Sequence, residues 1–520
     1  DPARFQVAMD VDIQAAELAR LAEPFGQTLP DLGQTRITGQ LVSVDSGLQF
    51  RDARLEVGAI DQPVIRARGR VTTQMQKGST INAVLDVAVT DLITAFTDRS
   101  PGYLGRLEGE ADISNLDGEW GIERFNLAST WTDLYQLHLD GSYDDVVHYD
   151  EASINSRLVV RNPEILGKVL GIKLAGVGPS RMQGKLSVNK GRLRYDGEST
   201  VGNTKSTTTI SGHLKDGKPV LDGSIKIPVM HLADFGLGPP APPVPGEPAT
   251  ASPHVFSREP LNTGFLNEVD LDLDVSIDEV ESGELAIDSV KGKLLLHDGR
   301  LKITPLRLVF EGGNTDINLD VWATAVPEYR LVVKADEVTL GPLMAQFQGQ
   351  VPIRGHTNID LDLMARGHSP HELASSLSGN INLGLENARI PKHYVDLLSV
   401  DVFGWVVSKS GATQQHMNLN CLMMTFAVKA GEVESETFIS DGPRLSLGGE
   451  INMNLGAETL DIVLIPQQKR QYFSSISPVT VTGPMKSPTV QAVPVKAALQ
   501  EIGTLALMPG LVLPARALGK

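Results

Sequence analysis

The sequence is poor in cysteine and has no long apolar run. Its one cysteine, Cys421, excludes a disulfide within the chain and leaves a cytosolic or a bacterial periplasmic location equally open. No apolar stretch reaches the roughly 20 residues that a bilayer-spanning helix needs. Because the sequence begins with Asp1 and Pro2, we expect that its natural N-terminus has been removed. A signal peptide or anchor helix could have preceded it.

Positive charge and aromatic residues are also scarce. Lysine and arginine number 46 against 63 acidic residues, which gives a formal net charge of −17, and no basic block interrupts the sequence. This balance argues against nucleic acid and against docking on anionic lipid headgroups by charge. A hydrophobic content of 41% fits neither a disordered chain nor a polytopic membrane protein. The 520 residues predict several domains or an elongated repeat architecture.

Motifs for chemistry are nearly absent. The sequence contains no phosphate loop, dinucleotide fingerprint, G-x-S-x-G elbow or H-E-x-x-H. The D-x-D-x-D string at residues 270–274 lacks the glycine turn of a calcium loop and predicts a solvated strand face. His356, His368 and His371 lack the carboxylate or cysteine that would complete a zinc set. We therefore expect no metal and no cofactor.

A catalytic role for Cys421 beside His416 is equally weak. The run MNLNCLMMTF around it is typical of an apolar strand, in which a free cysteine is usually a small buried hydrophobe. We expect that the chain is not an enzyme.

The sequence does contain stretches in which apolar and polar residues strictly alternate. In DLDLDVSIDEV (residues 270–280), apolar and acidic side chains take opposite sides of an extended chain. The same pattern returns as INLDVWA at Ile317, IDLDLMA at Ile359, INLGLEN at Ile381 and INMNL at Ile451. Each stretch predicts a strand with one apolar face and one wet face.

Glycine turns and short helices punctuate these strands. LLLHDGRLKI, LSVNKGRLRY and HLKDGKPVLDGSI each predict a hairpin between antiparallel strands. Helix-like segments at residues 89–98, 163–171, 230–236 and 339–347 form a loose repeat, HELASSL begins like a helix, and a longer helix is predicted at 391–407. GPPAPPVPGEPATASP cannot continue a sheet. We predict N-terminal repeats over 1–237, a Pro-rich linker over 238–256, a C-terminal region over 257–500 and an apolar tail over 501–520.

The predicted fold is all-β, an elongated antiparallel sheet that curls into a groove built of repeats, with a few short helices. Some 30 strands in meander order would form a sheet too long to stay flat, and its apolar side would line a trough suited to acyl chains. A packed sandwich of two sheets remains the alternative. Asp272, Asp274, Asp320, Asp360 and Asp362 would face water. The predicted lining residues are Leu271, Leu273, Val275, Ile317, Leu319, Ile359, Leu361, Leu363, Leu383, Met453 and Leu455.

The second half resembles the AsmA family of bacterial envelope proteins. The resemblance rests on DGRLKITPLRLVFEGG, on the S-x-x-x-L-x-x-S-L-S-G spacing at Ser369–Gly379 and on the closing PVTVTGP, within a series of segments from Asn267 to Gln491. The first half contains only segments that look like degenerate versions of the same unit. The resemblance implies a periplasmic β-groove that is held at the inner membrane by an N-terminal helix and that supplies phospholipid to the outer membrane. We expect that this helix has been removed from the sequence given.

These features lead to three hypotheses. The first is a periplasmic groove that carries glycerophospholipids between the inner and outer membranes, with phospholipids, the inner membrane, and the outer membrane or other envelope proteins as its partners. The second is a non-enzymatic assembly factor for outer-membrane proteins that uses exposed sheet edges. The third is a β-helix enzyme acting on a polysaccharide, against which the hairpin turns count.

Overall fold

The computed structural model describes most of the chain. The described residues are 8–17, 32–44, 47–59, 61–74, 77–96, 101–116, 118–129, 133–144, 151–171, 174, 176–215, 217–237, 254–261, 263–282, 285–310, 313–339, 354–391, 416–443, 445–469 and 478–492. The Pro-rich segment 238–253, the apolar tail and nearly all of the helices predicted at 339–347 and 391–407 lie outside these residues.

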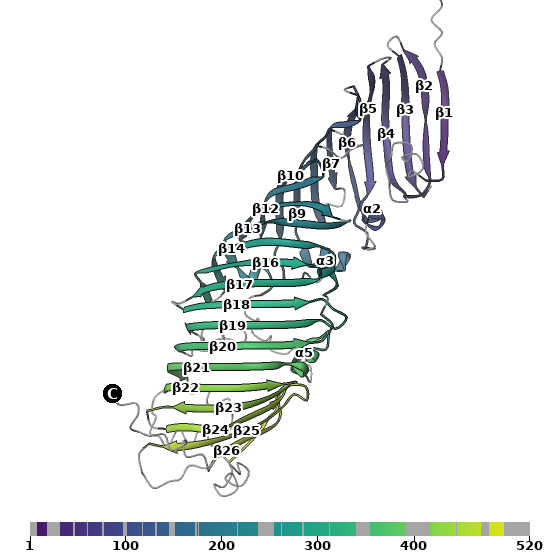
Figure 1. The fold of residues 1–520 in the computed structure, drawn as a ribbon. Helices are drawn as coiled ribbons and strands as arrows, with labels where there is room; N and C mark the ends of the chain where they lie inside the picture. The colour runs from purple at the N-terminus through teal and green to yellow at the C-terminus, as the bar shows by residue number, and fades with distance from the viewer. Residues whose placement is uncertain are drawn as a thin grey trace, which may run out of the picture. The chain divides into compact units, whose positions relative to one another are not determined.

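Two compact units make up the chain. The N-terminal unit comprises Asp1–Gly238 with Leu271–Glu279, and the C-terminal unit comprises Pro239–Asp270 with Val280–Lys520. Both consist of antiparallel strands that lie side by side in chain order (Figure 1). The described helices are few and short, so the predicted all-β fold class, an open curled antiparallel sheet, is confirmed.

In the N-terminal unit each strand pairs antiparallel with the next one in the chain. The strands are β1 (Ala8–Ala15), β2 (Thr35–Val44), β3 (Gly47–Gly58), β4 (Pro63–Gln74), β5 (Gly78–Ala88), β6 (Arg106–Ser114), β7 (Gly121–Ser129), β8 (Tyr135–Tyr143), β9 (Glu151–Val160), β10 (Ser180–Asn189), β11 (Arg192–Val201), β12 (Thr204–Lys215) and β13 (Lys218–His231).

The C-terminal unit repeats this organisation: the end of β14, Val280–Ser282, pairs with β15, and pairing is consecutive and antiparallel from β16 onward, whereas Leu271–Glu279 of β14 belong to the N-terminal unit. The strands are β14 (Asp270–Ser282), β15 (Leu285–Ile287), β16 (Ser289–His297), β17 (Arg300–Phe310), β18 (Gly313–Trp322), β19 (Glu328–Thr339), β20 (Arg354–Arg366), β21 (Ser378–Pro391), β22 (His416–Lys429), β23 (Glu432–Asp441), β24 (Leu445–Asn454), β25 (Thr459–Gln468), β26 (Val479–Pro484) and β27 (Thr489–Ala492).

Two-residue turns close the predicted hairpins. Lys190 and Gly191, between β10 and β11, have φ values of 48° and 70°. Asp298 and Gly299, between β16 and β17, have φ values of 47° and 74°. Positive φ at both central positions matches the twist of the flanking strands, which is why glycine is needed there.

The helices connect consecutive strands. They are α2 (Val89–Phe96) between β5 and β6, α3 (Pro163–Leu170) between β9 and β10, α5 (Pro370–Ser376) between β20 and β21, and the 3₁₀ turns η2 (Leu232–Asp234) and η3 (Gly264–Asn267). Asn162 caps α3 by accepting a hydrogen bond from the Ile165 amide. The helices expected at 89–98, 163–171 and HELASSL are confirmed. None of the helices in the described ranges has the length and apolar content needed to cross a bilayer.

The short helix predicted at 230–236 is wrong in extent, because only the 3₁₀ turn η2 is helical there. β13 continues through His231, and the Asp234 carboxylate then accepts hydrogen bonds from the amides of Asn203 and Thr204, both at 2.9 Å. These bonds hold the chain against the β11–β12 turn, where a longer helix would carry Asp234 away.

Apolar clusters sit at the ends of the strands. In the N-terminal unit, Leu104, Leu134, Tyr135 and Val160 form a buried cluster on which side chains of α2 and α3 pack. The Tyr135 hydroxyl donates to the Leu104 carbonyl at 2.8 Å, and burial raises the pKa of Tyr135. The short helices therefore close one end of these strands.

Candidate functional site

The register of the C-terminal unit extends the alternation of single strands into apolar rows. Residues directly opposite each other in an antiparallel pair point to the same face of the sheet. One row contains Ile303, Leu319, Leu331 and Leu363. The next contains Leu306, Ile317, Val333, Leu361, Ile381 and Phe426. A third contains Ala335, Ile359, Leu383 and Met424.

Six of the predicted lining residues lie in these rows, namely Ile317, Leu319, Ile359, Leu361, Leu363 and Leu383. Met453 lies on β24 opposite Val433 and Leu460. Leu455 follows the end of β24 and packs with Met453 against the buried cluster of Phe426, Val428 and Val433. Leu271, Leu273 and Val275 alternate along β14, where Leu273 is only 8% exposed. Their binding of a ligand stays a prediction.

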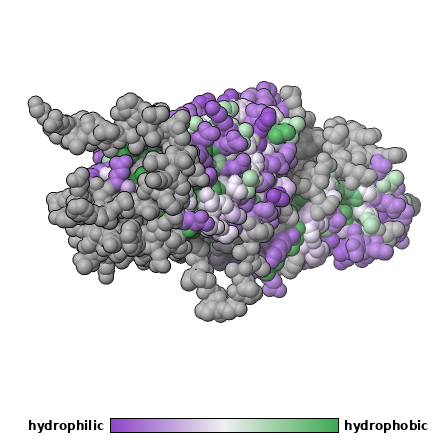
Figure 2. Space-filling view, turned by 90° about the horizontal axis from the view of Figure 1, so that it is seen from below, coloured by the Kyte–Doolittle hydropathy of each residue, from purple (hydrophilic) through white to green (hydrophobic). Residues whose placement is uncertain are grey.

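Most side chains of the central apolar rows are only half-buried, although Ala335 and Phe426 are 2% and 7% exposed. Ile317, Leu319, Leu361 and Leu383 all retain part of their exposure to solvent, whereas Val338 and Ala388, near the strand ends, are 1% and 2% exposed. A sealed sandwich core would bury the central side chains most completely. Among the residues that Figure 2 colours, hydrophilic ones predominate on the outer surface and hydrophobic ones lie between them. The apolar face is therefore open in its middle.

The opposite face of the same strands carries charge. Arg330 binds Asp362 at 2.8 Å, and its hydrogen bond lowers the pKa of that carboxyl group. Arg300 binds Asp320 at 2.7 Å. Asp360 and Asp274 are exposed, and Asp272 is half-buried. Cross-strand ion pairs thus keep one face wet and leave the other to apolar side chains.

The prediction that Asp270 faces water is wrong. Alternation places it on the solvated side of β14, but it is only 9% exposed. Its carboxylate lies 2.9 Å from His297 Nδ1 and accepts a hydrogen bond from the Asp298 amide at 3.2 Å. Ligand atoms of these three residues lie within 4.8 Å of one another. The hydrogen bonds account for this arrangement as a structural tie between the start of β14 and the β16–β17 turn.

The remaining candidates for chemistry do not converge. His368 is exposed, and His371 Nδ1 lies 3.8 Å from a Glu458 carboxylate oxygen. Cys421 is half-buried on β22, and His416 lies five residues away on the same strand, about 17 Å along it. Such a separation does not form a nucleophile and base pair.

The N-terminal unit has an apolar face whose residues the sequence analysis did not name, although β-groove repeats were predicted there. Ile37, Leu55, Ala67 and Leu85 form one row across β2–β5, and Leu127 and Leu139 lie opposite each other on β7 and β8. Small residues on β4, in IRARGRV, weaken the hydrophobic alternation, so the face emerges only from the register. The signal that could have found it is INAVLDV on β5, which alternates clearly.

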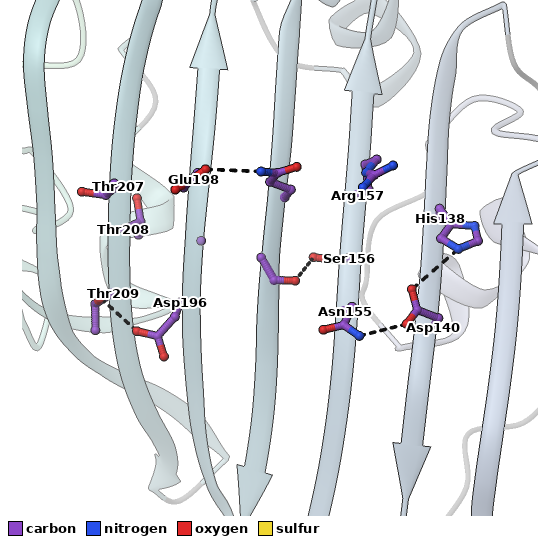
Figure 3. Close-up of a pocket in the computed structure, with 13 residues that line it drawn as sticks. His138, Asp140, Asn155, Ser156, Arg157, Asp196, Glu198, Thr207, Thr208 and Thr209 are labelled. Carbon is purple, nitrogen blue, oxygen red and sulfur yellow. Dashed lines mark hydrogen bonds and ion pairs between the residues drawn. The ribbon is translucent and has the colours of Figure 1, made fainter.

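A polar depression of about 700 Å³ lies in the N-terminal unit over β8–β12 (Figure 3). Its charged side chains belong to the face opposite the apolar one. Asp140 accepts a hydrogen bond from Asn155 at 2.9 Å, and Thr209 donates to Asp196 at 3.0 Å. The lining side chains pair with one another, so this depression offers no clear chemistry for a ligand.

Glu458 anchors a segment distant in sequence. It is 8% exposed and accepts hydrogen bonds from the amides of Val255 at 2.8 Å and Phe256 at 3.2 Å, which lower its pKa. The His371 amide donates to the Ser257 carbonyl at 3.0 Å. Residues 254–261 are therefore strapped to α5 and to the β24–β25 turn. No local pattern predicts a contact across about 200 residues.

Comparisons with known proteins identify one family. No curated protein and no solved structure matches the chain. The family model matches residues 242–438, which include the run at residues 298–313 and the spacing at Ser369–Gly379 but end before the PVTVTGP segment. Residues 242–438 are therefore similar to the AsmA family, which is associated with the bacterial envelope.

Proposed function

We propose that this envelope protein binds glycerophospholipids by their acyl chains and carries them between the inner and outer membranes. The observation that carries the proposal is the set of half-buried aliphatic rows on one sheet face, backed by ion pairs on the other. An open aliphatic face in water needs a partner, and acyl chains match its chemistry.

The dimensions of the face are suited to such chains. The row from Leu306 to Phe426 crosses six strands, which at about 4.8 Å per strand gives roughly 24 Å. One lipid leaflet contributes about 15 Å to the hydrocarbon core of a bilayer. Each methylene removed from water contributes about 0.8 kcal/mol, so a chain lying on the rows would be held without any polar contact.

The proposal includes a location and partners. The protein would work in the periplasm, attached to the inner membrane, with the headgroups of its lipids left in water at the open side. It would act without catalysis, metal or cofactor, by binding and passing its cargo.

Photo-crosslinking in cells tests the proposal. A photoreactive residue replaces Leu273, Leu319 or Leu361 in turn, with Asp272 and Asp360 as controls on the charged face, and mass spectrometry identifies adducts. We expect phospholipid adducts at the three leucine positions only. Equal labelling of both sets, or none, would overturn the proposal and favour an assembly factor that binds unfolded outer-membrane chains.

A further inference from the structure

Arginines gather on the face of β3 and β4 that lies opposite the apolar row. This basic face consists of Arg51, Arg54, Arg66, Arg68 and Arg70, while Leu55 and Ala67 point the other way. Arg54 lies directly opposite Arg68, and Arg70 follows two residues later on the same strand. Arg54, Arg68 and Arg70 are all exposed.

These three arginines differ from their neighbours in their partners, and Glu56, which lies on the same face, is directly opposite Arg66 and Arg36 instead. Arg66 binds Asp86, and Arg51 donates to the Gln49 side chain at 2.6 Å. Among the described residues, no carboxylate forms an ion pair with Arg54, Arg68 or Arg70. Like charges directly opposite each other destabilise a sheet, and an anion placed between them removes that cost.

The surroundings favour a broad anionic surface over a small ligand. Val84, directly opposite Arg68 on β5, is 56% exposed, and the row continues to Glu110 on β6. Arg36 on β2 and Arg106 on β6 lie on the same face but bind Asp12 and Asp86. Among the described residues, the exposed arginines of β2–β6 without such a partner therefore lie on β3 and β4. The polar depression over β8–β12 lies on other strands, and Arg54, Arg68 and Arg70 are exposed on the sheet surface.

We propose that the basic face docks on the anionic phospholipid headgroups of a membrane surface. Each guanidinium group presents paired N–H donors that suit phosphate oxygens, and the exposed Val84 side chain meets the interface beside them. The net charge of −17 does not reveal this patch. An anionic surface repels the protein as a whole but attracts the basic face. Docking would therefore also orient the N-terminal unit. The inference goes beyond the proposed lipid carriage and is tested separately from it.

Vesicle flotation measures the docking. The full chain is mixed with phosphatidylcholine vesicles, with or without about 30% phosphatidylglycerol, in about 0.1 M salt. The test variant is R54Q/R68Q/R70Q. The matched control is R181Q/K185Q/K205Q, which removes the same charge from exposed positions of β10 and β12 where no cation lies directly opposite another.

We expect the wild type and the control to bind the anionic vesicles. Each arginine contributes about fivefold near such a surface, so the test variant should bind roughly 100-fold more weakly. Salt of about 1 M should abolish the difference. Equal loss in both variants, or equal binding by all three proteins, would overturn the inference. Phospholipid adducts at Leu319 should persist in the test variant, so their loss would point to the lipid-carrying face instead.

Discussion

At the scale of single residues, which face a side chain takes decides what it can do. Leu361 and its neighbour Asp360 occupy adjacent positions on β20, yet Leu361 lies opposite Val333 and Ile381, whereas Asp360 lies opposite Lys334 and Asn382. Alternation in the sequence predicted this division on β18 and β20. It could not predict Asp270, because burial there depends on a histidine on another strand.

Leu361→Asp should stop lipid binding without unfolding the protein. The new carboxylate would lie among half-buried aliphatic side chains that offer it no partner, but it would keep access to water from the open side. We expect the adducts at Leu319 to fall at least tenfold, with circular dichroism unchanged.

Val332→Asp is the matched control for that change. Val332 is adjacent to Val333 but points to the charged face, between Arg330 and Lys334, whose positive charges offset the repulsion from Asp362 directly opposite. The same charge there should leave the adducts intact. Loss of secondary structure in Leu361→Asp would sink the prediction, because the site would then be a packed core.

At the scale of elements, strands and hairpins could be predicted more fully than tertiary ties. The turns at Lys190–Gly191 and Asp298–Gly299 can be predicted from three or four residues of sequence, because only certain side chains tolerate positive φ. The basic face depends on the register of β3 with β4, which shifts at a bulge between Phe50 and Ala53. No single strand reveals such a shift.

The tie between Glu458 and residues 254–261 should weaken in acid. The pKa of Glu458 is lowered in the fold, so its contribution is present above the ordinary glutamate value of 4.5 and is lost as the pH falls through the lower folded value. Hydrogen exchange at the Val255 and Phe256 amides measures this loss.

Glu458→Gln should expose the same two amides at neutral pH, because a neutral amide oxygen accepts these hydrogen bonds more weakly than a carboxylate. The variant and the wild type should exchange alike once the wild-type carboxyl group is protonated. If the wild-type amides stayed protected at a pH well below the folded pKa, something other than the charge of Glu458 would hold residues 254–261 in place.

At the scale of the whole molecule, the proposal makes both units carry lipid in series. Leu85→Asp on β5 places a charge on the apolar face of the N-terminal unit, as Leu361→Asp does in the C-terminal unit. Either change alone should stop the chain-dependent arrival of phospholipid at the outer membrane. The double variant should be no worse than either single one.

The measurement is the transfer rate of labelled phospholipid in cells that depend on this chain. Charges at Asn82 and Val332, which point to the opposite face, serve as controls. Partial loss in each single variant, with complete loss only in the double variant, would mean that the two units act independently, and transport in series would then be wrong.

Pairing with the next strand along the chain also bears on how such a protein can change in length. Inserting or deleting one hairpin within a unit adds or removes two neighbouring strands, and every remaining strand keeps its direction and its inward and outward sides. An odd number would reverse all the strands that follow. Nearest-neighbour assembly also lets folding start at several hairpins and spread. The length of such a sheet can therefore change in steps of two strands, wherever the affected hairpin makes no contact with a distant segment such as that between Glu458 and residues 254–261.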